Sequence, residues 1–526
     1  MPVPLSYPGV YLEEIPSGVR TITGVATSIT AFLGRAPRGP ANEPTTINSF
    51  GDFERTFGGL AVNYPMSYAV RDFYLNGGST AVIVRLLNGA KAAEIALPTG
   101  QPAPNDAPLT LQAASEGVWG DNLTVDVDLQ TKDPANASLF NLTITENDPI
   151  TKQALKIEKS LNLSVDVNDP RYVPRALENE SSLVRVKKDK GGWLVSKVPP
   201  QATPKGTPVA PTTKGANDSA LTDGSYTGSQ DDKTGMFALE KADLFNLLCI
   251  PSDNRPGDTS PPVYQAAMAY CAKRRAMLIV DSPAAWSANK ETAAAAARDG
   301  LPKLGLSGPE ARNAAVFFPR VLESDPLSNG QTDVFVPCGI VTGVMARTDT
   351  ARGVWKAPAG LDAALNGIQG IQVNLTDLEN GMLNPLGINC LRDFKINGRV
   401  VWGSRTLRGA DQLADEYKYI PVRRTALYIE ESLYRGTQWV VFEPNDEPLW
   451  AQIRLNVGAF MHNLFRQGAF QGQTPKEAYF VKCDKETTTQ NDINLGIVNI
   501  VVGFAPLKPA EFVVIKIQQI TGQIDT

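Results

Sequence analysis

The hydrophobic pattern in the middle of the chain is typical of an α/β domain. Apolar runs at Phe245 to Ile250, Met277 to Val280 and Ala314 to Phe318 have the length and composition of buried strands. Between them, residues 263–275 and the alanine-rich stretch 292–298 predict helices. Because strands that alternate with helices commonly form a parallel sheet covered by helices, we expect a partly parallel α/β sheet.

An earlier part of the chain continues this alternation. A run rich in Thr, Ile and Val at 21–34 and an apolar run at 81–87 predict strands, and residues 67–75 predict a helix. The sequence Asn76-Gly77-Gly78 suits the end of that helix. We therefore expect these segments to belong to the same α/β domain.

Residues 109–198 have a different pattern. Short runs such as Leu123 to Leu129 and Phe140 to Thr145 alternate apolar and polar residues, which predicts antiparallel strands. Residues 199–233 are rich in Pro, Thr, Gly and Asp and contain few large apolar residues, so we expect a long surface loop. This part of the chain is predicted to be a β-rich inserted module.

The pattern changes again after Asn384. Helices are predicted near residues 424–434 and 448–466, and strands follow them, the last one at 497–504. Asn445 and Asp446 are suitable N-caps for the second helix. The apolar stripe of that helix comprises Leu449, Trp450, Ile453, Val457, Phe460, Met461, Leu464 and Phe465. These features predict a C-terminal α+β domain.

Both ends of the chain are β-prone and are set off by prolines. The run Gly9 to Ile15 is closed by Pro16, and Glu511 to Ile520 alternates after Pro506 and Pro509. A long apolar terminal strand is an aggregation hazard unless it pairs, and adding it to a neighbour's sheet edge gives the pairing a function. The expected parts are therefore an N-terminal arm (1–20), an α/β domain (21–104 and 235–383), an inserted module (105–234), a C-terminal domain (384–505) and a C-terminal arm (506–526).

Composition narrows the class of protein. The chain has 526 residues, which at about 150 residues per domain suggests three or four domains. It carries 50 Lys plus Arg against 55 Asp plus Glu, a net charge of −5, so we expect no nucleic-acid partner. The first residues contain no apolar signal region, and the run Ile497 to Leu507 is about half the roughly 20 residues of a spanning helix. We expect no direct membrane insertion.

Catalytic chemistry has little support in the sequence. No phosphate-loop motif occurs, Asp281 is interpreted as a turn or helix-cap residue, and the single histidine, His462, is interpreted as a packing or surface residue. We therefore expect no enzyme activity, no catalytic residue, no cofactor and no metal site. The cysteines lack zinc or redox spacing and are expected to be buried reduced thiols: Cys249, Cys271, Cys338, Cys390 and Cys483.

A series of short motifs spans nearly the whole chain. They include Tyr7-Pro-Gly-Val-Tyr-Leu-Glu-Glu-Ile-Pro-Ser-Gly18, Val70-Arg-Asp-Phe-Tyr-Leu-Asn-Gly-Gly78, Gly353-Val-Trp-Lys-Ala-Pro-Ala-Gly360, Phe442-Glu-Pro-Asn-Asp446 and Gly468-Ala-Phe-Gln-Gly472. Together they closely resemble the motifs of contractile tail sheath proteins, which occur in myophage tails, R-type pyocins and phage-tail-like contractile injection systems. Residues from about 135 to 233 give no support to this resemblance.

The resemblance implies a structural sheath subunit. Six subunits would form a ring, and rings would stack helically around an inner tube and contract to drive the tube through a target envelope. Stored conformational energy, and not a nucleotide, would power the change. The implied partners are further copies of the chain, the inner tube protein, and baseplate and tail-terminator or cap proteins. Such particles are assembled in the bacterial cytoplasm and form a virion tail or a phage-tail-like particle.

The resemblance also implies the roles of individual residues, with the C-terminal domain facing the tube, the inserted module facing outward, and arms from neighbouring subunits completing a sheet. The donated strands would be Gly9, Val10, Tyr11, Leu12, Glu13 and Glu14 in one arm and Phe512, Val513, Val514, Ile515, Lys516 and Ile517 in the other. The receiving sheet would contain Tyr479, Phe480, Val481, Val498, Ile500 and Val502. The hinges would be Pro16, Gly18, Pro506 and Pro509. Candidate tube contacts, which could equally form salt bridges within the domain or lattice, are Arg423, Arg424, Arg454 and Arg466.

Two other functions remain open from the residues alone. An α/β enzyme would be built on residues 245–318 and would need a polar pocket at the strand ends. An outward-facing receptor-binding protein would use residues 109–198 to bind glycans or cells. The sequence also leaves open whether the particle is a phage, a bacteriocin or an injection system.

Overall fold

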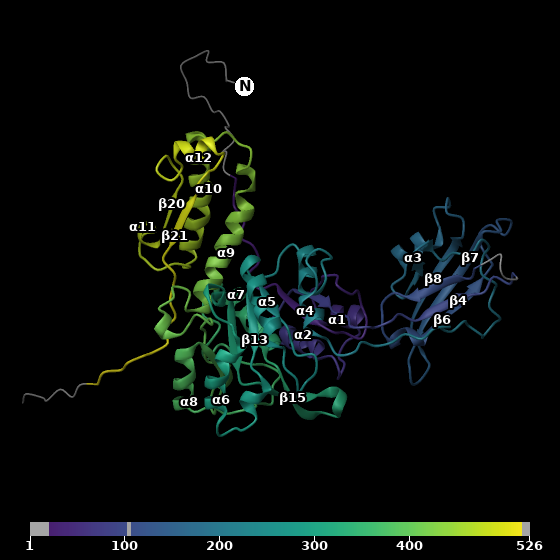
Figure 1. Ribbon diagram of the computed structural model, residues 1–526, viewed down its shortest axis with the longest axis horizontal. Helices are drawn as coiled ribbons and strands as arrows, with labels where there is room; N and C mark the ends of the chain where they lie inside the picture. Colours follow the sequence, from purple (N-terminus) through teal and green to yellow (C-terminus); the bar gives the residue numbers. More distant parts are fainter. Residues whose placement is uncertain (1–19, 102–106, 518–526) are drawn as a thin grey trace, which may run out of the picture. The chain divides into compact units, whose positions relative to one another are not determined.

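The computed structural model describes residues 20–101 and 107–517 (Figure 1). The chain falls into two compact units. The α/β unit contains residues 28–347 and 359–413, and the C-terminal unit joins residues 20–27, 348–358 and 414–517 of the described chain. The C-terminal unit is thus assembled from three separate stretches of sequence.

An eight-stranded sheet forms the centre of the α/β unit. Its order is β2-β3-β1-β12-β13-β14-β18-β19, and the six inner strands are parallel while β2 and β19 are antiparallel edges. The partly parallel sheet that the sequence predicts is therefore confirmed. The strands are β1 (Thr30–Gly34), β2 (Thr45–Ile47), β3 (Ala81–Arg85), β12 (Leu247–Cys249), β13 (Met277–Asp281), β14 (Ala314–Phe318), β18 (Ile388–Phe394) and β19 (Gly398–Val401).

Helices and a small sheet accompany the central sheet. The predicted helices at 67–75, 263–275 and 292–298 are confirmed as α2, α5 and α6, and α5 and α6 share one hydrophobic core with the six inner strands of the sheet. The helices are α1 (Phe50–Phe57), α2 (Pro65–Leu75), α4 (Asp223–Thr227), α5 (Pro261–Lys273), α6 (Ala293–Gly300), α7 (Cys338–Arg352) and α8 (Asp377–Leu383). The small sheet contains β15 (Val321–Asp325), β16 (Gln331–Phe335) and β17 (Gly370–Ile371).

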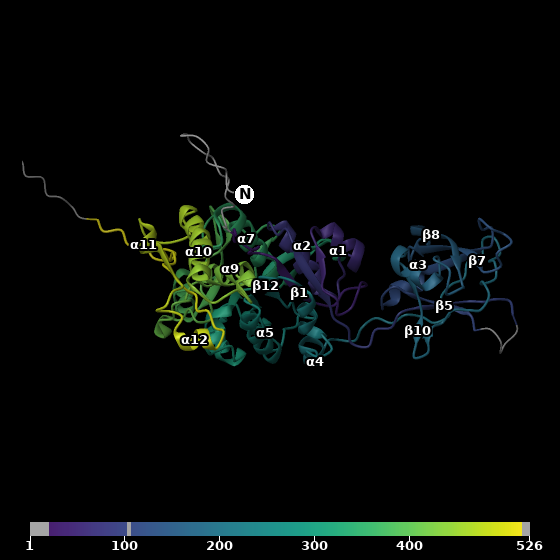
Figure 2. The same cartoon turned by 90° about the horizontal axis from the view of Figure 1, so that it is seen from above.

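The inserted module is antiparallel, as its alternating pattern predicts (Figure 2). Its strands form two three-stranded sheets and one hairpin around a hydrophobic core of their own. The long connection at 199–233 carries α4 and adds isolated bridges from Val209 to Val125 and from Thr213 to Glu94. The elements are β4 (Glu94–Leu97), β5 (Leu109–Ala113), β9 (Val184–Val186), β6 (Leu123–Asp128), β7 (Leu139–Asn147), β8 (Ala154–Ser164), β10 (Lys188–Asp189), β11 (Gly192–Trp193) and α3 (Val173–Glu180).

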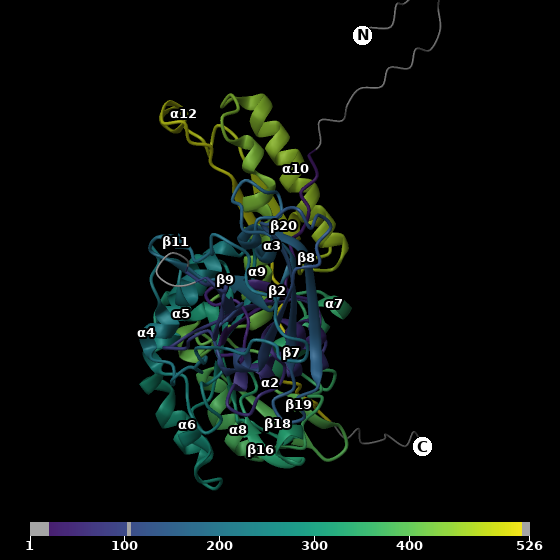
Figure 3. The same ribbon diagram turned by 90° about the vertical axis from the view of Figure 1, so that its right-hand side faces the viewer.

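Two long helices dominate the C-terminal unit, α9 (Ile420–Gly436) and α10 (Glu447–Arg466) (Figure 3). The Asp446 side chain accepts a hydrogen bond from the backbone N–H of Leu449, so Asp446 is the N-cap of α10. The predicted stripe of α10 forms a core, with every member buried except the half-buried Phe465. Smaller elements are α11 (Pro475–Ala478), β20 (Tyr479–Lys482), α12 (Gln490–Asn494) and β21 (Val501–Phe504).

Three predicted boundaries are wrong. The strand expected at 21–34 is confined to β1, because backbone N–H groups at Arg20 and Val25 donate to side chains of Asn456 and Ser432 and not to a neighbouring strand. Residues 384–413 belong to the α/β unit because β18 pairs in parallel with β14. The strand expected at 497–504 is limited to β21.

Two chemical predictions can be compared with the structure. All five cysteines are buried and unpaired, as expected for structural thiols. In residues 20–101 and 107–517, no helix combines the length and apolar character needed to cross a bilayer.

Candidate assembly surfaces

The C-terminal tail is the most exposed apolar segment of the chain's described part. Glu511 is tied to the C-terminal unit, where its Oε2 accepts a hydrogen bond of 3.0 Å from the Tyr419 hydroxyl. Residues 511–517 form no helix or strand. The exposed fractions of Phe512, Val513, Val514, Ile515 and Ile517 lie between 74% and 93%. Contiguous exposed apolar side chains of this kind mark interaction sites.

A two-stranded antiparallel sheet lies in the same unit. In β20 and β21, Tyr479 is paired with Phe504 and Val481 with Val502, and these side chains pack on the α10 core. Among the described residues the sheet contains no third strand, so each strand has one unpaired edge. Two-stranded sheets are marginal by themselves. This sheet therefore has open edges on which an added strand can form hydrogen bonds.

The remaining residues expected in the receiving sheet do not all lie in strands. Val498 and Ile500 precede β21 and pack half-buried against the α10 core. Phe480 is half exposed, and its ring lies against Gly503, where an added Cβ would come within 2.2 Å of it. Glycine at this position therefore allows the Phe480 ring to lie across the sheet.

The predicted hinges differ in how they are held. Pro506 forms an isolated antiparallel bridge with Phe470, and the backbone N–H of Gln471 donates to the Ala505 carbonyl at 2.9 Å. Pro506 is thus fixed to the C-terminal unit. The other C-terminal hinge candidate, Pro509, lies beyond this bridge. The candidate hinges Pro16 and Gly18, and the donated strand Gly9 to Glu14, lie outside the described residues.

The four candidate arginines have different surroundings. Arg423 pairs with Glu430 at 3.1 Å and lies over the Tyr417 ring, and Arg454 pairs with Glu447 at 2.5 Å. Arg424 is buried and pairs with Asp349, which is the salt bridge within the domain that the sequence left open as the alternative to a tube contact. Arg466 is exposed and forms no ion pair within the described chain.

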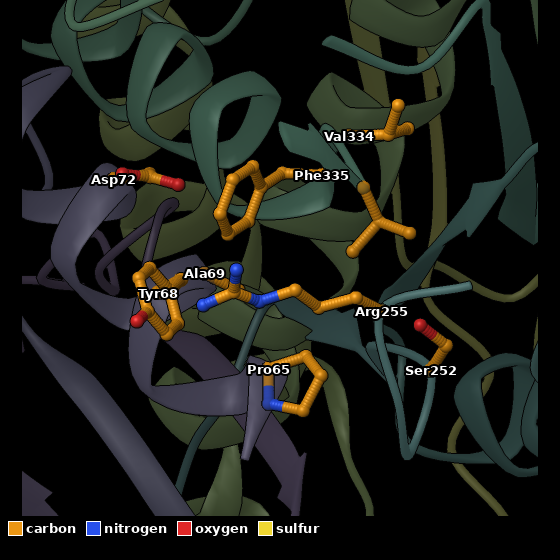
Figure 4. Close-up of a pocket in the computed structure, with 9 residues that line it drawn as sticks. Pro65, Tyr68, Ala69, Asp72, Ser252, Arg255, Val334 and Phe335 are labelled. Carbon is orange, nitrogen blue, oxygen red and sulfur yellow. The ribbon is translucent and has the colours of Figure 1, made fainter. Parts of the chain in front are cut away.

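A small pocket lies in the α/β unit between α2 and β16 (Figure 4). The Arg255 guanidinium lies 4.6 Å from the Tyr68 ring and 4.7 Å from the Phe335 ring and pairs with Asp325 at 2.6 Å. Hydrogen bonds from Tyr68, Ser328 and Arg255 outweigh the effect of burial and lower the pKa of Asp325 to about 2. The cavity volume of about 10 Å³ suits one water molecule and no substrate.

Two carboxyl groups are buried beside this pocket. Arg71 on α2 pairs with Asp72 at 2.9 Å and with Glu323 on β15 at 2.5 Å. Burial raises the pKa of both carboxyl groups, and the charge of Asp72 raises that of Glu323 further. The three side chains join α2 to the small sheet, which is a structural role.

Asp281 and His462, the two residues weighed for catalysis in the sequence, have different surroundings. Asp281 ends β13, is buried, and its Oδ1 accepts a hydrogen bond of 2.9 Å from the backbone N–H of Cys338, the first residue of α7. This confirms its interpretation as a helix-cap residue. His462 is exposed, and its ring centroid lies 6.1 Å from that of Phe465. In residues 20–101 and 107–517, no group of His, Cys, Asp or Glu side chains could hold a metal ion.

One feature of the C-terminal unit was not predicted from the sequence. Residues 20–27 and 348–358 belong to the C-terminal unit, and Thr27 and Asp349 both contact Arg424 on α9. Gly24 is the only local signal, because an added Cβ there would lie 1.9 Å from the Tyr428 hydroxyl. The glycine within this Thr/Ile/Val-rich run thus indicates that the backbone at residue 24 lies close to Tyr428 on α9.

Comparisons with known proteins agree with the resemblance of the motifs. Residues 414–520 match the family model of the phage tail sheath C-terminal domain. A tail sheath protein of Burkholderia phage BcepMu is 24% identical over 482 residues, which cover 88% of this chain and 87% of that protein.

Solved structures of sheath proteins share the fold. The helical sheath of the anti-feeding prophage in its contracted state superposes with a TM-score of 0.58 at 23% identity, covering 98% of this chain and 99% of that one. The sheath of the extracellular contractile injection system PVC, also contracted, gives 0.57 at 21% identity and 98% coverage of both chains. A sheath tail protein from Listeria innocua gives 0.57 at 14% identity, covering 93% of this chain and 96% of that one. Residues 414–520 thus belong to the phage tail sheath C-terminal domain family, and the chain as a whole has the fold of the contractile tail sheath proteins.

Proposed function

We propose that the chain is the structural sheath subunit of a contractile phage tail or of a related injection machine. Six subunits form a ring, and the rings stack helically around an inner tube. Contraction of the stack drives the tube through a target envelope. The energy is stored in the extended assembly as strained contacts between subunits, so no nucleotide is required. The family match and the shared fold support this proposal.

The proposal includes exchange of strands between neighbouring subunits. The single observation that carries it is the exposed apolar tail at 512–517, which lies in the same unit as a two-stranded sheet with open edges. Adding a strand pairs the backbone groups of both partners and removes the apolar side chains from water. Burial of apolar surface contributes about 25 cal/mol per Å². Residues 9–14 are the corresponding donated strand of the N-terminal arm.

The proposed partners follow from the same assembly. They are further copies of the chain, the inner tube protein, the baseplate, and a tail-terminator or cap protein. The C-terminal unit faces the tube and the inserted module faces outward. Arg466 is the remaining exposed arginine candidate for a tube contact. The subunit is assembled in the bacterial cytoplasm and becomes part of a virion tail or phage-tail-like particle.

Electron microscopy of single-residue variants tests strand exchange. Val514→Pro removes a backbone N–H and blocks strand pairing, whereas Val514→Thr keeps a β-branched residue that suits a strand. We expect hollow, ridged cylinders from the wild type and from Val514→Thr, and only isolated subunits from Val514→Pro. A chain without residues 1–18 should behave like Val514→Pro.

The matched pair separates assembly from folding. Because Val514 is exposed and lies outside any helix or strand, both variants should unfold at the wild-type denaturant concentration. Cylinders from Val514→Pro would show that the C-terminal arm does not donate a strand. Isolated subunits from all chains, even with the tube protein present, would refute the sheath assignment itself.

A further inference from the structure

Residues 20–27 form an extended strap that runs antiparallel to α9. Ile22 packs on Gly436, the backbone N–H of Val25 donates to the Ser432 hydroxyl at 3.2 Å, and Gly24 lies against Tyr428. The carbonyl of Thr27 accepts a hydrogen bond of 2.9 Å from Arg424. The helix positions 424, 428, 432 and 436 are four residues apart and therefore share one face. The strap covers this face along most of the helix.

The N-terminal end of the strap is fixed by α10 and by the turn after α9. The backbone N–H of Arg20 donates to Asn456 Oδ1 at 3.0 Å. The Arg20 guanidinium lies 4.6 Å from the centre of the Trp439 ring. Arg20 is the last residue of the N-terminal arm (1–20), so these contacts fix the end of the arm to the C-terminal unit.

The C-terminal end of the strap is fixed by a buried ion pair. Arg424 binds both oxygens of Asp349, at 2.9 and 2.6 Å, and the Thr27 hydroxyl donates to Asp349 Oδ2 at 2.7 Å. The Arg424 and Asp349 side chains are only 3% and 4% exposed. A bidentate pair of this kind is directional and poorly screened by salt. It joins all three stretches of sequence that build the C-terminal unit.

We propose that the strap is a fixed anchor for the N-terminal arm, and that Gly24, Asp349 and Arg424 are positioning residues for that arm. The inference rests on the proposed strand exchange. A pull on the arm by a neighbouring subunit reaches Arg20 and is distributed over α9 and α10. The strap stays bound to α9 in both the extended and the contracted sheath.

Limited trypsin digestion of the full-length subunit tests the strap's position. In Gly24→Ala the new methyl group overlaps the Tyr428 hydroxyl, so the strap is displaced and cleavage after Arg20 accelerates about tenfold. The double variant Gly24→Ala with Tyr428→Ala removes the overlapping side chain and restores slow cleavage. Gly458→Ala on α10 is the control, because nothing lies within 4 Å of its added Cβ. Equal cleavage rates in all four chains would refute the anchor.

Hydrogen exchange in assembled sheaths tests whether the anchor is permanent. We expect the amide of Val25 to exchange equally slowly in the extended and contracted states of the wild type. Fast exchange in the contracted state would show that the strap releases, which contradicts the proposal. The trypsin result on isolated subunits does not depend on assembly. Slow wild-type cleavage together with cylinders from the chain lacking residues 1–18 would therefore reject strand exchange and leave the strap intact.

Discussion

Single buried residues determine how the stability of the α/β unit responds to pH. Asp281 is buried, and its Oδ2 has no hydrogen-bond partner among the described residues. Burial raises the pKa of Asp281 from 3.8 to about 7. Between these values the native state binds more protons than the unfolded chain, so stability falls as the pH rises.

Asp281→Asn should remove this pH dependence, because asparagine keeps the oxygen that accepts from Cys338 but does not titrate. Relative to the wild type, we expect the variant to gain about 3 kcal/mol in unfolding free energy between pH about 5 and about 8. Urea unfolding of the isolated subunit at both pH values measures this difference. Exposed Asp231→Asn is the control and should give parallel curves. A constant difference between Asp281→Asn and the wild type would show that Asp281 is ionised throughout.

At the scale of the element, most side chains of α10 are either buried in the core or exposed to solvent. Ile453 is fully buried in the core of the C-terminal unit, whereas Leu455, two residues further on, is 52% exposed. Both side chains have the same number of carbon atoms. The helix therefore provides two side chains of equal size that differ strongly in burial.

Ile453→Ala should destabilise the C-terminal unit by about 3 kcal/mol, because it removes apolar contacts and leaves a cavity. Leu455→Ala should change stability by less than about 0.5 kcal/mol. Chemical denaturation followed by tryptophan fluorescence can report both, since Trp450 belongs to the same core. If Leu455→Ala lowers stability only in assembled sheaths, the Leu455 side chain contacts a neighbouring subunit.

The same scale explains which elements the sequence predicts. Helices α5 and α10 and strands β13 and β14 follow from periodicity, because each buries its own apolar face or run. The strap resembles a strand in composition, but its partner is a helix about four hundred residues away, and periodicity contains no information about partners. The boundary near 384 was misplaced because β18 completes the sheet begun at β1.

The tail shows a different limit. Residues 512–517 continue the alternation of a strand, yet within the described part of the chain they belong to no helix or strand. The proposed strand exchange would account for this pattern, which the fold of the subunit does not use. Arg424 belongs to the fold of the subunit, because it pairs with the buried Asp349. The sequence of the amphipathic helix does not reveal this partner, since the aspartate lies on another element.

At the scale of the whole molecule, the inserted module joins the chain through adjacent ends. Lys91 and Ala216 form an antiparallel bridge in which each backbone N–H donates to the other's carbonyl at 2.9 Å. The module also has its own core, which includes Phe140, Leu142 and Leu177. Ends that lie side by side and a separate hydrophobic core are properties of an independently folding domain.

Residues 91–216 expressed alone should therefore fold and unfold cooperatively. Circular dichroism should show β-sheet, and one denaturation transition is expected. Glycan arrays probed with this fragment also test the receptor-binding alternative, which requires binding by the module alone. A fragment that stays unfolded would show that contacts such as the ion pair between Arg38 and Glu146 are needed for its stability.

The contact between the strap and α9 also sets an order of events during protein synthesis. The backbone N–H of Val25 and the hydroxyl of Ser432 are separated by 407 residues, so the ribosome makes the strap long before the helix that binds it. At about 5 to 20 residues per second, this delay is roughly 20 to 80 seconds. The point from which the N-terminal arm projects is not fixed until α9 and α10 have been translated. Under the proposed strand exchange, we therefore expect polymerisation to wait until the strap is bound and the subunit is nearly complete.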